Sequence, residues 1–185
     1  MARREAASDS TQPAGAAGPE ERLIQLRLLV DELTEEERRH FRIDHSIVNT
    51  AEPFIAFVTE WTRQHFNCTR NEAFERMKRG SDPNGLPITL MIRAVIEYAM
   101  PASRGLEPAM IADLGEETAR RYLAEMNRIR DLAIDNPNAM AGIMQFETLN
   151  LPRDVRRKYL LTRETAEAHW EAYLRVITVC RLTHI

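Results

Sequence analysis

Cysteine and glycine are scarce in this sequence, and neither occurs in a pattern that carries chemistry. The two cysteines, Cys68 and Cys180, exclude a disulfide framework and a cysteine-based zinc site. The seven glycines never fall in the spacing of a phosphate-binding loop, and no two histidines lie four residues apart as in a helical zinc motif. No apolar run approaches the length of a membrane span. We therefore predict a protein that is not an enzyme, with no catalytic residue, metal, cofactor, small-molecule substrate or membrane partner.

Basic residues gather in two groups, although the net charge of the chain is −3. A single basic groove on a near-neutral body is sufficient to bind nucleic acid. The first group comprises Arg70, Arg76, Lys78 and Arg79, and the second Arg153, Arg156, Arg157, Lys158 and Arg163. Each adjoins a helix-breaking loop, where free backbone amides also favour anions. The plain alternative for either group is a solvated helix face.

The composition of the chain changes at Glu20, which suggests how it is organised. Residues 1–19 are small, polar or charged and offer nothing to bury, so we expect a disordered tail. Residues 20–50 are interpreted as an N-terminal arm with an amphipathic helix, residues 51–182 as a helical core domain, and residues 183–185 as the C-terminal end. The helical stripe of the arm consists of Leu23, Leu26, Leu29 and Leu33.

Hydrophobic periodicity and turn residues predict a mainly α-helical protein with one helical-bundle core. Thr34 with Glu37, and Thr69 with Glu72, have the spacing of capping boxes that begin helices. The loop from Gly80 to Pro87 is the clearest internal break. Helices are expected over about 52–66, 70–80, 88–99, 107–134, 138–149 and 162–182, with another beginning at Pro152.

Several short motifs resemble those of the coat proteins of flexuous filamentous plant viruses, closest to the potyvirus family. The family has a Ser-Pro-Asn loop, similar to residues 81–84, and then a helix that ends in Glu, Ala, Pro and Arg at fixed spacing, similar to residues 95–104. Phe146-Glu147 stands where the family has a Phe-Asp pair, and Pro152 with Arg153 and Arg156 follows it as the family's basic segment does. Phe57 and Trp61 resemble the aromatic pair that opens the family's core.

The resemblance implies a structural coat protein that polymerises helically around single-stranded viral RNA, in the virion and the host-cell cytoplasm. It implies an RNA-backbone pocket formed by Ser81, Arg104 and Glu147, to which the basic segment would add Arg153, Arg156 and Arg157. The alternative for Arg104 and Glu147 is an ion pair that never meets RNA.

The leucine stripe would then dock on a neighbouring subunit of the homopolymer, and the alternative is that it packs on its own core. The competing function is a helical protein–protein adaptor or regulatory domain with no nucleic-acid role. A small helical enzyme with an unrecognised site is less favoured.

Overall fold

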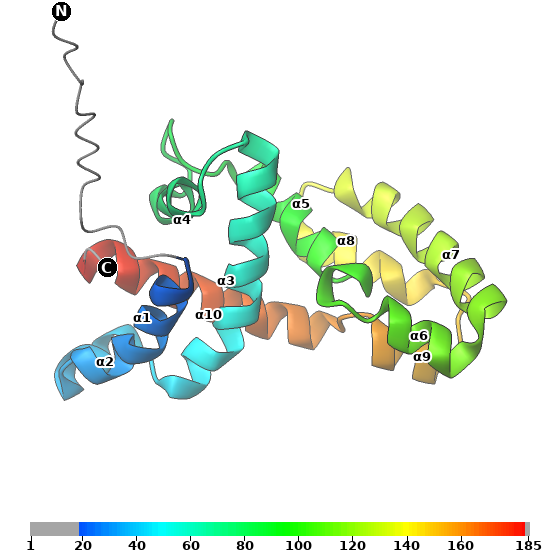
Figure 1. Cartoon of the computed structure of the whole chain (residues 1–185), viewed down its shortest axis with the longest axis horizontal. Helices are drawn as coiled ribbons and strands as arrows, with labels where there is room; N and C mark the ends of the chain where they lie inside the picture. Colours follow the sequence, from blue (N-terminus) through cyan, green and yellow to red (C-terminus); the bar gives the residue numbers. More distant parts are fainter. Residues whose placement is uncertain (1–18, 184–185) are drawn as a thin grey trace, which may run out of the picture.

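The structure, a computed structural model, describes the backbone of residues 19–183 and the side chains from Leu26 onward (Figure 1). The predicted tail of residues 1–19 therefore lies outside the described residues except for the backbone of Pro19, as do the side chain of Leu23 and residues 184–185. The prediction of a mainly α-helical protein is confirmed, and none of residues 19–183 forms a strand. No helix within this range combines the length and the hydropathy that a membrane span requires.

The helices follow one another with short connections. In chain order they are α1 (Pro19–Glu32), α2 (Glu35–Phe41), α3 (His45–Phe66), α4 (Arg70–Arg79), α5 (Ile88–Tyr98), the 3₁₀ turn η1 (Ala102–Arg104), α6 (Glu107–Leu114), α7 (Glu116–Ile134), α8 (Ala139–Met144), the 3₁₀ turn η2 (Gln145–Thr148), α9 (Arg153–Tyr159) and α10 (Arg163–Thr183).

Both predicted capping boxes are present. Thr34 Oγ1 accepts a hydrogen bond from the Glu37 amide at 3.2 Å, and Glu37 Oε2 accepts one from the Thr34 amide at 2.8 Å. Thr69 and Glu72 make the same reciprocal pair at 3.2 and 2.7 Å. These bonds satisfy amides that a helix N-terminus would otherwise leave unpaired, so α2 and α4 begin where their sequences specify.

Two predicted helix boundaries differ from the structure. The helix expected from about residue 52 begins at His45, because Asp44 Oδ1 accepts the Ile47 amide at 2.9 Å and serves as the N-cap. Pro53, which suits a first turn, lies inside α3 instead. The helix expected over 107–134 is divided into α6 and α7 at Gly115, whose φ of 80° is not helical and favours glycine.

One long helix, α10, connects the two halves of the molecule (Figure 1). It crosses α3, against which it packs most extensively, and α1 and α4 also pack against α3 (Figure 1). On the other side, α5 packs against α7 and α8, and α6 packs against α7. Buried side chains from both halves form one continuous core, so the predicted single-core architecture describes the packing.

The predicted division between an arm and a core at residue 50 is not seen, because that position lies inside α3. Leu26, Leu29 and Leu33 are buried in the same core as the side chains of α3, and α1 packs on α3. Leu26, Leu29 and Leu33 therefore pack within the subunit, which is the alternative given above for the stripe, and the side chain of Leu23 lies outside the described residues.

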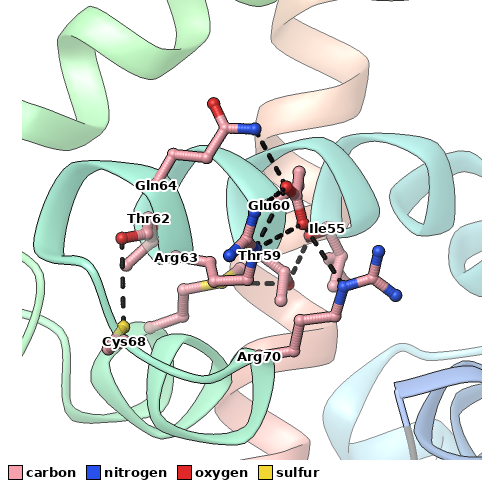
Figure 2. Close-up of polar contacts among 9 residues, drawn as sticks. Ile55, Thr59, Glu60, Thr62, Arg63, Gln64, Cys68 and Arg70 are labelled. Atoms are coloured by element: carbon pink, nitrogen blue, oxygen red, sulfur yellow. Dashed lines mark hydrogen bonds and ion pairs between the residues drawn. The ribbon is translucent and has the colours of Figure 1, made fainter.

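A carboxylate joins α3 to α4 at the corner between them (Figure 2). Glu60 accepts hydrogen bonds from Arg63 Nη2 at 2.8 Å, from Gln64 Nε2 at 2.9 Å and, across the corner, from Arg70 Nε at 3.3 Å. The bonds from Arg63 and Gln64, with the positive charge of Arg63, lower the pKa of Glu60 from 4.5 to about 2.

Replacing Glu60 by glutamine is expected to destabilise the fold in a pH-dependent way. Because the folded-state pKa lies below the unfolded value of 4.5, the carboxylate stabilises the protein above pH 4.5, and this contribution is lost as the pH falls toward 2. With about a third of the side chain exposed and screened by water, we expect a loss of about 1 kcal/mol at pH 7. Urea unfolding at several pH values measures it.

The control for this prediction is Glu116→Gln, which removes an exposed i, i+4 pair with Arg120. Such a pair contributes at most about 0.5 kcal/mol. A Glu60→Gln effect that stays constant from pH 7 to pH 2 would contradict the assigned role of the carboxylate.

Candidate nucleic-acid interface

A cleft of about 910 Å³ opens at the junction of α9 and α10. The end of α8 and η2 form one wall, α9 forms another, and the α9–α10 linker with the first turn of α10 completes it. Its lining residues are Ile143, Phe146, Glu147, Arg153, Arg156, Arg157, Leu160, Leu161, Thr162, Arg163 and Glu164. Four of the predicted RNA-binding residues, together with Arg163 of the same basic group, are thus brought to one place.

The short helix α9 aims its arginines into this cleft because its opposite face is anchored. Val155 and Tyr159 are buried, and the Tyr159 hydroxyl donates to Asp113 Oδ2 of α6 at 2.7 Å. Arg153, Arg156 and Arg157 follow one another at i, i+3 and i+4 and so share a helix face. Lys158 points instead toward α6, where its ammonium pairs with Asp113 at 2.7 Å, and it does not line the cleft.

The four arginines of the cleft differ in how far they are already engaged. Arg156 donates from Nη1 to the backbone carbonyl of Glu147 at 2.6 Å. Arg163 donates from Nε to Glu167 at 2.8 Å, and this hydrogen bond and charge raise the pKa of its guanidinium. Arg153 and Arg157 are exposed and make no hydrogen bond or ion pair within the part of the chain that the structure describes. Two guanidinium groups are therefore free for an external anion.

The remaining lining groups shape the electrostatics of the cleft. Glu147 and Glu164 are exposed carboxylates, so the four arginines leave an excess of positive charge. Ile143, Phe146 and Leu160 form a largely buried apolar floor. Arginine stays charged at any physiological pH and binds phosphate oxygens through two parallel N–H groups. The chemistry offered here is a fixed cationic surface for phosphate.

Arg104 does not line the cleft, and it does not pair with Glu147. Its Nη2 donates to two backbone carbonyls, Ala99 O at 3.1 Å and Tyr159 O at 2.6 Å. The side chain is half-buried, and burial lowers the pKa of its guanidinium. The expected ion pair between Arg104 and Glu147 is therefore wrong, because the hydrogen-bond partners of the guanidinium are backbone carbonyls.

The other predicted elements of an RNA site do not converge with the cleft. Ser81 is exposed in the loop between α4 and α5, which lies beside α3 and α4 and away from α9 (Figure 1). In the first basic group, Arg70 pairs with Glu60, and the Arg76 guanidinium lies 4.5 Å from the centre of the Phe66 ring. Lys78 pairs with Glu75 at 2.9 Å. Arg70, Arg76 and Lys78 are thus engaged in local contacts, whereas Arg79 is exposed and forms no ion pair among the described residues.

Leu161, Thr162 and Glu164 were not predicted as site residues. They line the cleft because the chain turns between α9 and α10, where the Leu161 amide donates to Ala99 O at 3.3 Å. A tertiary contact of this kind leaves no periodic signal in the sequence. No group of three or more His, Cys, Asp or Glu side chains that could hold a metal occurs within the described residues.

No protein-family model, curated protein or solved structure matches this chain. What the cleft can bind is therefore deduced from its own charges and geometry.

Proposed function

We propose that this chain is a coat protein that polymerises around single-stranded RNA and holds the phosphate backbone in the cleft between η2, α9 and α10. The observation that carries the RNA contact is the pair Arg153 and Arg157, two exposed cations in a concave site with no partner among the described residues. Elsewhere on the surface many arginines are engaged, for example Arg63 with Glu60 and Arg128 with Glu125.

Binding through phosphate rather than through bases follows from what the cleft exposes. Phe146 is the one aromatic side chain among the lining residues, and it is only 3% exposed. A base therefore finds no aromatic ring face on which to stack. In proteins that recognise unpaired bases, such stacking supplies much of the binding free energy. Phosphate contacts carry no sequence information, so the binding is independent of sequence. A single strand bends into such a cleft, whereas duplex DNA is stiff over about 150 base pairs.

Polymerisation is inferred from the resemblance to flexuous-virus coat proteins, and Leu26, Leu29 and Leu33 are already buried within the subunit. Other large apolar side chains are exposed on several helices: Leu28, Ile88, Leu132, Met144, Leu174 and Leu182. They lie on α1, α5, α7, α8 and α10. A heterologous contact joins two different faces, and it builds an open filament when the rotation does not close.

Electron microscopy of the purified protein with and without RNA tests this function. We expect flexuous rods in the sample with single-stranded RNA. We expect them to disassemble at 1 M salt, where the Debye length is only about 3 Å and contacts with phosphate are screened. A sample treated with ribonuclease before assembly is the control. Discrete monomers or dimers under every condition would contradict the proposal and favour the adaptor domain.

A further inference from the structure

Two helices end against each other beside the cleft, and each leaves carbonyl groups without helical partners. Tyr98 is the last residue of α5, followed by Ala99, and Tyr159 is the last residue of α9. The Arg104 guanidinium bridges these two ends through one nitrogen, Nη2, which lies 3.1 Å from Ala99 O and 2.6 Å from Tyr159 O. A cation at two helix C-termini also faces the negative ends of both helix dipoles.

The same carbonyl of Ala99 fixes the linker that forms one wall of the cleft. It accepts a second hydrogen bond from the Leu161 amide at 3.3 Å. Leu160, Leu161 and Thr162 line the cleft, and they separate Arg157 on α9 from Arg163 on α10. The path of this linker therefore determines how far apart the cationic groups of α9 and α10 stand.

Arg104 itself is poorly placed to bind a polyanion. Nη2 is occupied by the two carbonyls, and Nε is buried with no partner among the described residues. Its charge contributes, after burial, to lowering the pKa of His169 on α10, whose ring lies 5.7 Å from that of Tyr98. The guanidinium thus lies near Tyr98 of α5 and His169 of α10, and it does not line the cleft.

We infer that Arg104 is a positioning residue for RNA binding: it holds the α9–α10 linker, and through it the spacing of the cleft arginines, without touching RNA. This inference rests on the proposed function of the cleft. Arg104 thus contributes to RNA binding although it does not line the cleft. This also gives a role to a half-buried cation whose desolvation costs free energy.

A double-mutant cycle separates positioning from direct contact. Arg104→Met removes the donors and keeps the aliphatic stem, and Arg153→Gln with Arg157→Gln removes the free cations of the cleft. We expect Arg104→Met to weaken binding of a single-stranded RNA by about tenfold in the wild-type background and by less than about twofold in the cleft variant. Arg121→Met, which removes an exposed arginine of α7, controls for net charge and is expected to bind as wild type.

Additive losses in the cycle would show that Arg104 contacts RNA itself, and an unchanged affinity of Arg104→Met would show that it only stabilises the fold. Either result overturns the inference. Arg104→Lys keeps a cation within reach of the carbonyls but loses the planar fork, so we expect it to restore part of the affinity. It also serves if Arg104→Met does not fold.

Hydrogen exchange without RNA tests the positioning independently. The Leu161 amide is expected to exchange about tenfold faster in Arg104→Met, while the amide of Val58 in the centre of α3 keeps its protection. If the wild-type protein binds no RNA, the proposed function fails and this exchange result still decides whether Arg104 positions the linker. An unchanged Leu161 rate would refute positioning.

Discussion

Leu29→Ala is expected to lower the free energy of unfolding by about 2–5 kcal/mol. Leu29 is fully buried in the core that α1 shares with α3, so truncation removes apolar contacts and leaves a cavity. The neighbouring Leu28 of the same helix is 47% exposed. Leu28→Ala is therefore a matched control, for which we expect a change within about 0.5 kcal/mol.

Urea unfolding at a protein concentration too low for assembly measures both variants. A large loss for Leu29→Ala alone would support the intramolecular packing of α1. If both variants unfold like wild type while Leu29→Ala fails to form filaments, the stripe belongs to a neighbouring subunit and the packing of α1 described above is wrong.

Local chemistry explains which parts of the fold could be predicted from the sequence. The capping boxes at Thr34 and Thr69 depend on residues three apart, and the end of α4 depends on Gly80, whose φ of 58° suits glycine. Each of these signals depends on residues within about one helical turn of one another. The start at His45 depends on Asp44 as N-cap, a local signal that the apolar periodicity beginning near residue 52 does not include.

Tertiary contacts explain what could not be predicted. The leucine stripe has the same periodicity whether it packs on its own α3 or on a neighbour, so the sequence leaves both open. The spacing of Arg153, Arg156 and Arg157 predicts a shared face, but nothing local shows that Lys158 turns toward Asp113. Likewise, the partners of Arg104 are carbonyls, and one of them lies 55 residues along the chain.

Neutralising the two free cations of the cleft is expected to remove most of the RNA affinity without affecting the fold. Arg153→Gln with Arg157→Gln deletes no contact within the described residues, so the melting temperature should stay within about 2 °C of wild type. Each phosphate neutralised on a single strand contributes about 0.7 to the slope of log affinity against log salt. The loss of affinity caused by removing two contacts is then roughly 25-fold larger at 0.1 M salt than at 1 M salt.

Arg79→Gln with Arg181→Gln is the matched control pair, with the same change in net charge. Both arginines are exposed and form no ion pair among the described residues. Arg181 lies 18 residues after Arg163 on the same helix, which places it about 27 Å from the cleft. If RNA affinity depended only on the total charge of the protein, the cleft pair and the control pair would lose the same affinity.

The salt dependence of RNA affinity tests the central claim most directly. A titration of one labelled single-stranded RNA from 0.05 to about 0.5 M salt yields the slope for wild type, the cleft pair and the control pair. We predict a slope shallower by about 1.4 for the cleft pair and unchanged for the control pair. Equal slopes and affinities for the two pairs would show that the cleft between η2, α9 and α10 is not where RNA binds.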